Sequence, residues 1–190
     1  RDLSKSRGLG DVYKRQPISS FENVLNSIKD NLKTGSILTD TCSVKTGVSK
    51  IFEKMNLKNS VCIPGHPVAG IENSGPKAGF ADLFKNKWTI LTPSKSTDEN
   101  TIQKVSNFWE SLGSKVKIMS DEDHDKILTF TSHLPHVVAY NIVKTSMSHD
   151  EEVKDDIIKY SAGGLRDFTR IAASDPCLLY TSPSPRDCDR

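Results

Sequence analysis

The sequence predicts an α/β domain with a parallel sheet, followed by an all-helical part. Two observations predict the first part: short apolar strands alternate with amphipathic helices as far as residue 119, and the joints between them are short. A third observation predicts the second part, because from Ser120 onward the apolar residues recur at helical spacing. Ligands bind at the carboxyl ends of parallel strands, so functional residues are expected just after each strand.

Four strands and three main helices are expected in the α/β part. The strands are 36–39, 60–63, 88–91 and 115–119. The helices are 19–33, 44–55 and a segment carrying Ile102, Val105, Phe108, Trp109 and Leu112. A short helical stretch is also expected over 76–84, and Ser96 with Glu99 forms a capping-box pattern before the third helix.

The helical part is expected to begin with one long helix that runs to about Met147. Ser120 and Asp123 suggest its N-terminal cap, and Pro135 is expected to kink it. Two shorter helices are expected around 150–160 and 164–173.

The two ends of the sequence do not continue this pattern. Residues 1–16 and 177–190 resemble translated adapter sequence, and we expect them to be non-native tails. The α/β part then covers 17–119 and the helical part 120–176. Between the tails lie 19 basic and 20 acidic residues, so the formal charge of +2 belongs to the tails and does not favour a nucleic-acid surface.

Composition also bears on localisation. No apolar run approaches the ~20 residues of a membrane span, and no signal-peptide pattern is visible. Outside the tails there are two cysteines, Cys42 and Cys62, which form neither a disulfide framework nor a metal-ligand pattern. A reducing cytoplasm is therefore the expected compartment.

His66 is the main candidate for chemistry. It lies between Gly65 and Pro67, just after the strand 60–63, where an imidazole can act as acid, base or hydrogen-bond partner. Ser43 follows the preceding strand, so both side chains are expected to face one crevice, where the hydroxyl could fix the imidazole tautomer. Ser43 as a simple helix cap, and a non-catalytic His66, remain open alternatives.

Two further clusters lie in the helical part. His133 and His136 are three apart on a helix, but no third metal ligand accompanies them, which leaves partly buried polar residues or substrate contacts. Arg170 is a helical neighbour of Arg166 and Asp167, which makes either a solvated ion-pair face or a binding group for a carboxylate.

A dinucleotide-binding fingerprint is not visible. Gly8 and Gly10 make an isolated GxG in the N-terminal tail, with no strand before it and no third glycine after it, so this match is interpreted as chance. If the protein has such a fingerprint, it is expected upstream of Pro17.

Five stretches, in this order, resemble the prephenate dehydrogenase family, including its arogenate and cyclohexadienyl members. They are DTCSVK, PGHPVAGIENSGPKAGF, KWTILTP, SHLPH and GGLRDFTRIAASDP, and the resemblance runs from about residue 17 to 176. It implies the C-terminal part of a Rossmann-like domain, followed by part of a helical domain that forms a homodimer. It further implies oxidative decarboxylation of prephenate or arogenate with NAD or NADP in tyrosine biosynthesis, without a metal. A nucleic-acid or membrane partner is not expected, on the composition given above.

The resemblance also assigns roles to residues. His66 matches the histidine that hydrogen-bonds the ring hydroxyl of the substrate and helps remove its proton. Ser43 matches the serine that orients this histidine near the nicotinamide, and Asp40 is expected beside it at the cofactor site. Arg170 matches an arginine that binds a substrate carboxylate. Glu72 and Asp167 match acidic residues linked with that arginine near the entrance. His136 and His133 match histidines that line the substrate pocket.

Two other functions remain open at this stage. One is a hydroxyacid dehydrogenase of the same two-domain plan, although its usual helical-domain lysine motif is not visible. The other is a non-catalytic dimerisation or regulatory module. Since the glycine-rich loop and much of the helical domain are expected outside these 190 residues, we expect this chain to bind cofactor poorly and to turn over little. The choices between NAD and NADP and between prephenate and arogenate also stay open.

Overall fold

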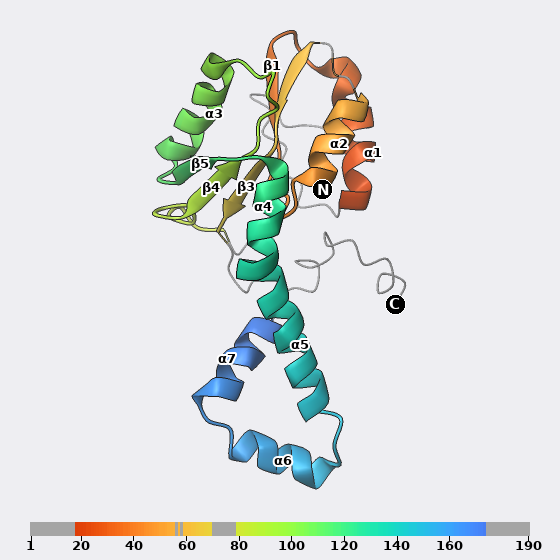
Figure 1. Cartoon of the computed structure of the whole chain (residues 1–190), viewed down its shortest axis with the longest axis vertical. Helices are drawn as coiled ribbons and strands as arrows, with labels where there is room; N and C mark the ends of the chain where they lie inside the picture. The colour runs from red at the N-terminus through yellow and green to blue at the C-terminus, as the bar shows by residue number, and fades with distance from the viewer. Residues whose placement is uncertain (1–17, 56, 58, 70–78, 174–190) are drawn as a thin grey trace.

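The computed structural model describes residues 18–55, 57, 59–69 and 79–173. The expected tails, 1–16 and 177–190, lie outside these residues. Within them an α/β part is followed by a helical part that extends away from it (Figure 1). The predicted order of an α/β part and then helices is confirmed.

The first sheet is the expected parallel pair. Strand β1 (Ser36–Thr39) pairs with β2 (Ser60–Ile63) in parallel, from Ser36 opposite Ser60 to Thr39 opposite Ile63. Helix α2 (Thr46–Met55) makes the crossover between them. The carboxyl ends of β1 and β2 therefore meet at the same edge.

The second sheet contains a strand that the sequence did not predict. Strand β3 (Gly65–Val68) pairs antiparallel with β4 (Trp88–Leu91), and β4 pairs in parallel with β5 (Lys115–Ile118). Pro64 separates β2 from β3, because proline has no N–H to continue the ladder. Its carbonyl accepts from the N–H of Thr92 at 2.9 Å, so the chain leaves β1 and takes β4 as its new neighbour.

Two hydrophobic clusters cover the faces of the strands. Helix α1 (Ile18–Ile28) and α2 lie on one side of the strands and α3 (Glu99–Ser111) on the other (Figure 1). The first cluster centres on Leu25, Val48 and Phe52. The second centres on Ile63, Leu91, Val105 and Trp109. Because side chains alternate along a strand, Cys62 faces the first cluster and Ile63 the second.

Three local predictions in this part need correction. Helix α1 ends at Ile28 and a 3₁₀ turn, η2 (Lys29–Asn31), follows it, so the α-helix does not reach residue 33. The N-cap of α3 is Asp98 and not Ser96, because the Asp98 carboxylate accepts from the N–H of Thr101 at 2.9 Å. Residues 81–86 form turns rather than the end of a helix, while 76–78 lie outside the described residues.

The helical part begins where the sequence predicted. Ser120 caps α4 (Asp121–Leu128) by accepting from the N–H of Asp123. A π-helical turn (Thr129–His133) joins α4 to α5 (Leu134–Ser146), and Pro135 is the second residue of α5. A proline nitrogen cannot donate to the preceding turn, and the widened turn accommodates it there. The expected long helix is therefore two helices with a π turn between them. In Figure 1, α4 and α5 follow one another away from the α/β part and form a stalk.

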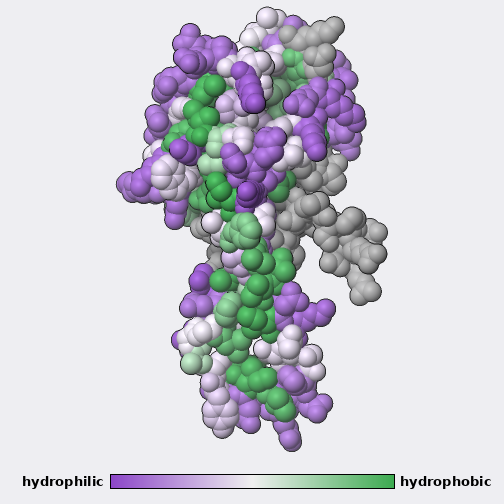
Figure 2. Space-filling view, in the orientation of Figure 1, coloured by the Kyte–Doolittle hydropathy of each residue, from purple (hydrophilic) through white to green (hydrophobic). Residues whose placement is uncertain are grey.

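The last two helices are α6 (Glu151–Lys159) and α7 (Gly163–Ala172), and α7 packs against α5. Many large apolar side chains of this part remain exposed. They include Phe130, Leu134, Val137, Val138, Val153 and Ile158. Figure 2 shows this hydrophobic surface running along the stalk. None of the helices within the described ranges has the length and apolar character needed to cross a membrane.

Candidate active site

A buried ion pair lies just after β1. The Nζ atom of Lys45 is 2.5 Å from Oδ2 of Asp40 and 2.7 Å from the carbonyl oxygen of Gly65. The other carboxylate oxygen of Asp40 accepts from the N–H of Gly65 at 3.0 Å. Both side chains are buried, so the pair ties the loop after β1 to the first residue of β3.

Any side chain at position 65 would crowd the end of β1. A Cβ atom there would lie 2.9 Å from Oγ1 of Thr39, 3.1 Å from the carbonyl oxygen of Asp40 and 3.3 Å from Leu91. Glycine permits this close approach, and the group that approaches is the end of β1. His66 is thereby held beside the carboxyl edge of β1 and β2.

The imidazole of His66 makes a hydrogen bond with a second histidine. Its Nδ1 atom lies 2.8 Å from Nε2 of His124, which is in the first turns of α4 and is completely buried. The Nδ1 atom of His124 in turn lies 2.8 Å from Oδ1 of Asp125. Three side chains from both parts of the chain thus form one hydrogen-bonded series.

Asp125 ends that series and also caps α2. Its Oδ1 and Oδ2 atoms accept from the N–H groups of Lys45 at 2.7 Å and Thr46 at 2.9 Å. A carboxylate at a helix N-terminus is favoured by the unpaired N–H groups and by the helix dipole. Burial alone would raise the pKa of Asp125, but the hydrogen bonds from His124, Thr46 and the backbone outweigh it and hold the pKa well below its usual value. The helical part is therefore fastened to the α/β part by an ionised carboxylate.

His66 is a neutral imidazole at physiological pH. Burial lowers its pKa from 6.5 to about 3, and the nearby positive charge of Lys45 lowers it further in the same direction. A neutral imidazole has one N–H donor and one nitrogen that accepts. It can therefore take a proton from a hydroxyl group placed against it.

The other expected site residues are distributed around this series. His133 is buried in the π turn, where desolvation lowers its pKa. A positive charge on His133 would lower the pKa of His66. His136 lies one turn further along, and its Nδ1 atom is 2.8 Å from the carbonyl oxygen of Ser132. Ser43 is partly buried in the loop between Asp40 and Lys45, on the same edge as His66. The partner that the structure gives to the His66 Nδ1 atom is His124.

The residues expected to bind a carboxylate lie further along the chain. Arg170 is on α7, its side chain is 59% exposed, and its Nη2 atom lies 3.7 Å from Oδ1 of Asp167. This is the helical neighbour pair that the spacing predicted. Glu72 lies outside the described residues.

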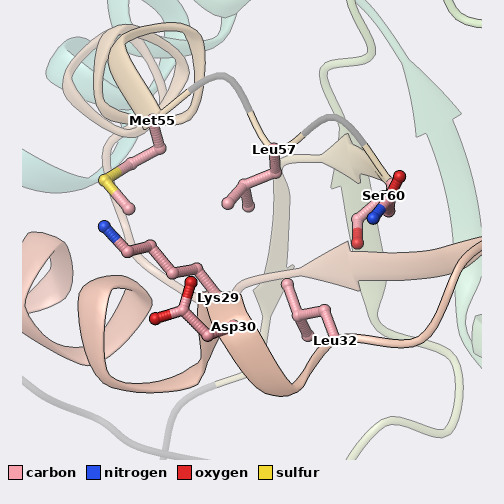
Figure 3. Close-up of a pocket in the computed structure, with 7 residues that line it drawn as sticks. Lys29, Asp30, Leu32, Met55, Leu57 and Ser60 are labelled. Atoms are coloured by element: carbon pink, nitrogen blue, oxygen red, sulfur yellow. The ribbon is translucent and has the colours of Figure 1, made fainter.

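A hollow at the other end of the sheet is not part of this site (Figure 3). Its lining residues precede β1 or lie from the end of α2 to the start of β2, and they include Lys29, Asp30, Leu32, Met55, Leu57 and Ser60. It lies at the amino ends of β1 and β2, whereas His66 and Asp40 lie at the carboxyl ends. Among the described residues, no group of three or more His, Cys, Asp or Glu side chains is placed to hold a metal ion.

Comparison with known proteins agrees with this architecture. Residues 15–118 match the family model described as "Prephenate dehydrogenase, nucleotide-binding domain", and residues 120–182 match "Prephenate dehydrogenase, dimerization domain". The chain belongs to the prephenate dehydrogenase family. The resemblance that the five sequence stretches carried is therefore confirmed.

Individual members of the family are similar over most of this chain. The cyclohexadienyl dehydrogenase of Zymomonas mobilis is 42% identical over 162 residues, which are 85% of this chain and 55% of the relative. A crystal structure of prephenate dehydrogenase from Aquifex aeolicus, in complex with hydroxyphenyl propionate and NAD+, matches with 38% identity and a TM-score of 0.75. It covers 86% of this chain and 56% of that one. The arogenate dehydrogenase structure from Synechocystis matches with 26% identity and a TM-score of 0.69, over 87% of this chain and 63% of that one. The chain thus spans about half the length of the first of these relatives.

Sequence reasoning did not single out three residues of this site. Lys45 was visible only as part of the DTCSVK stretch, and His124 and Asp125 lay within an acidic run interpreted as a helix cap. The available signal was a His-Asp pair in the first turns of the helix that begins the dimerization domain. Nothing in its spacing from His66, 58 positions away, indicates the contact.

Proposed function

We propose that the complete protein containing these residues oxidises and decarboxylates prephenate or arogenate, using NAD or NADP. The observation that carries the proposal is the neutral imidazole of His66, held at the carboxyl edge of β1 and β2 by a hydrogen bond to His124. Membership of the family supports the same reaction.

His66 would take the proton in this reaction. When a hydride leaves the ring carbon that bears the hydroxyl, positive charge builds up unless the hydroxyl proton leaves as well. A neutral imidazole at hydrogen-bond distance accepts that proton, which typically contributes ~10²–10⁴-fold to a rate. Loss of the ring carboxylate as carbon dioxide then gives an aromatic product.

The cofactor would bind at the carboxyl edge of β1 and β2, beside the loop after β1. The nicotinamide supplies the hydride acceptor when it is bound. Both carboxylate oxygens of Asp40 bond to groups of this chain, so we propose that Asp40 contributes to the cofactor site by shaping this edge. Ser43, in the same loop, is the residue that we place beside the nicotinamide and His66.

We place the substrate between His66 and the start of the helical part. His133 and His136 would line the pocket there, since His133 lies close enough to affect the charge of His66. Arg170 would bind a carboxylate, with Asp167 beside it and Glu72 near the entrance. The exposed apolar side chains of α5 and α6 support a homodimer that buries them. Two free cysteines, Cys42 and Cys62, are compatible with a cytoplasmic protein.

The test is a direct assay of the complete gene product. Prephenate and arogenate are each supplied with NAD or NADP, and the reduced cofactor is followed by its absorbance. His66→Asn should abolish turnover while leaving the circular dichroism spectrum and the dimer unchanged. His149→Asn, at an exposed position in the turn after α5, is the matched control and should be as active as the unmodified protein.

Two results would overturn the proposal. One is the absence of turnover with all four combinations in a folded dimer, which would favour a non-catalytic dimerisation module. The other is an unchanged rate for His66→Asn. The 190-residue chain alone should produce little reduced cofactor, and rapid production by it would contradict that expectation.

A further inference from the structure

His66 can work as a base only if its free ring nitrogen faces the substrate. An imidazole with one proton carries it on Nδ1 or on Nε2, and the hydrogen bonds of the ring decide which. Nδ1 of His66 is committed to His124, so the accepting nitrogen must be Nε2. The opposite tautomer would present an N–H to the hydroxyl and could not remove its proton.

The hydrogen-bonded series settles this choice from its far end. Asp125 is held as a carboxylate by the backbone N–H groups of Lys45 and Thr46 at the start of α2, and a carboxylate can only accept. With one proton on each ring, His124 must therefore carry its proton on Nδ1 and accept at Nε2. The remaining N–H of the pair then has to be on Nδ1 of His66.

We propose that His124 and Asp125 are positioning residues that hold His66 in the Nδ1–H tautomer, with Nε2 as its proton acceptor. This inference rests on the proposed function for its purpose, although the tautomer itself does not depend on any substrate. When His66 takes a proton on Nε2, its Nδ1–H continues to donate to His124, so the ring need not turn. The proton moves from the substrate hydroxyl to Nε2, and none has to travel on to Asp125.

The surroundings of His66 are consistent with a single proton on its ring. The charged and titratable groups that act on it are Lys45 before α2, His124 and Asp125 on α4, and His133 in the π turn. Lys45 is fully buried and bonded to Asp40, so its positive charge is fixed close to the series. A second proton on the His66 ring is opposed by this charge and by burial.

The decisive experiment is nitrogen NMR of the histidine rings in the ¹⁵N-labelled 190-residue chain at pH 8. Two-bond ¹⁵N–¹H correlations distinguish a protonated Nδ1 from a protonated Nε2, and His66→Gln and His124→Gln identify the two sets of signals. We expect both rings to be predominantly Nδ1–H. A predominantly Nε2–H ring at His66 would overturn the proposal, whatever the activity of the complete protein.

Two variants test where the preference comes from. His124→Gln keeps an amide near the position of Nε2, but this amide can either donate or accept, so His66 should become a mixture of tautomers. Asp125→Asn replaces one accepting oxygen with a donor and should have the same effect. His149→Gln, which is exposed, is the control and should leave the His66 signals unchanged. An Nδ1–H ring that persists in both variants would contradict the role of the series.

Kinetics of the complete protein separate this inference from the proposed function. Asp125→Asn should lower kcat by roughly twofold or more with little change in KM, in line with the fraction of His66 rings that carry the wrong tautomer, because the substrate still binds. An inactive complete protein with an Nδ1–H ring would remove the proposed function and leave the tautomer assignment in place. A higher KM and a lower free energy of unfolding in Asp125→Asn, with kcat retained, would show a merely structural role.

Discussion

The Nζ atom of Lys45 lies 2.5 Å from Oδ2 of Asp40, and both side chains are almost completely removed from solvent. The pair joins the carboxyl end of β1 to the residue that precedes His66, through the N–H and the carbonyl of Gly65. The position of the His66 imidazole therefore depends on a buried ion pair.

Loss of this ion pair should destabilise the fold. Lys45→Met leaves the Asp40 carboxylate buried without its charge partner, and breaking such a pair typically costs about 3–5 kcal/mol. The measurement is the free energy of unfolding from urea titration. Lys54→Met is the matched control, because its ion pair with Glu22 is exposed and such pairs contribute about 0–1 kcal/mol. Equal stabilities for the two variants would show that the buried pair is not needed.

A methyl group at position 65 should also be costly. In Gly65→Ala the new Cβ would stand 2.9 Å from Oγ1 of Thr39 and 3.1 Å from a backbone oxygen, so β1 and β3 would have to separate. Overpacking of this kind costs typically 1–3 kcal/mol. Gly164→Ala is the control, since nothing lies within 4 Å of the added atom. Thermal unfolding of both variants gives the comparison, and an unchanged midpoint for Gly65→Ala would be against this contact.

Acid should destabilise the protein between about pH 6.5 and pH 3. The pKa of His66 falls from 6.5 in the unfolded chain to about 3 in the fold, so in this window the unfolded state binds the extra proton. The stability is fully present above pH 6.5 and is lost as the pH falls, by at most about 1.4 kcal/mol per pH unit for this one group. Stability measured against pH should therefore be flatter in His66→Gln, and equally steep in the control His149→Gln. Parallel curves for all three proteins would exclude the shift.

Arg170 should affect substrate binding in the complete protein. Arg170→Gln removes a planar fork suited to a carboxylate, so KM for prephenate or arogenate should rise by roughly tenfold or more. Arg166→Gln, one helical turn earlier and also exposed, is the matched control and should leave KM unchanged. If both variants raise KM equally, the effect is one of general charge and not of a specific carboxylate contact.

Much of the fold followed from local patterns. The strands β1, β2, β4 and β5 and the helices α2, α3 and α7 lie within a few residues of their predicted positions, because each carries a periodic apolar face that must be buried. Ser120 was correctly predicted as a cap, since its bond to Asp123 is local. Strand β3 was missed because Gly65 and Pro67 are typical of loops, and only the neighbouring strand β4 makes them a strand.

The candidate site also has a part that local sequence patterns predict and a part that depends on tertiary contacts. The sequence by itself determined that His66 and Ser43 follow adjacent strands, and therefore that they share an edge, because the order of strand, helix and strand requires it. Only the tertiary structure decided what His66 touches, since the buried His124 and the carboxylate of Asp125 come from a helix that begins more than 50 residues later. Sequence periodicity reports which face of an element is buried, whereas a hydrogen bond between distant side chains depends on how two domains pack.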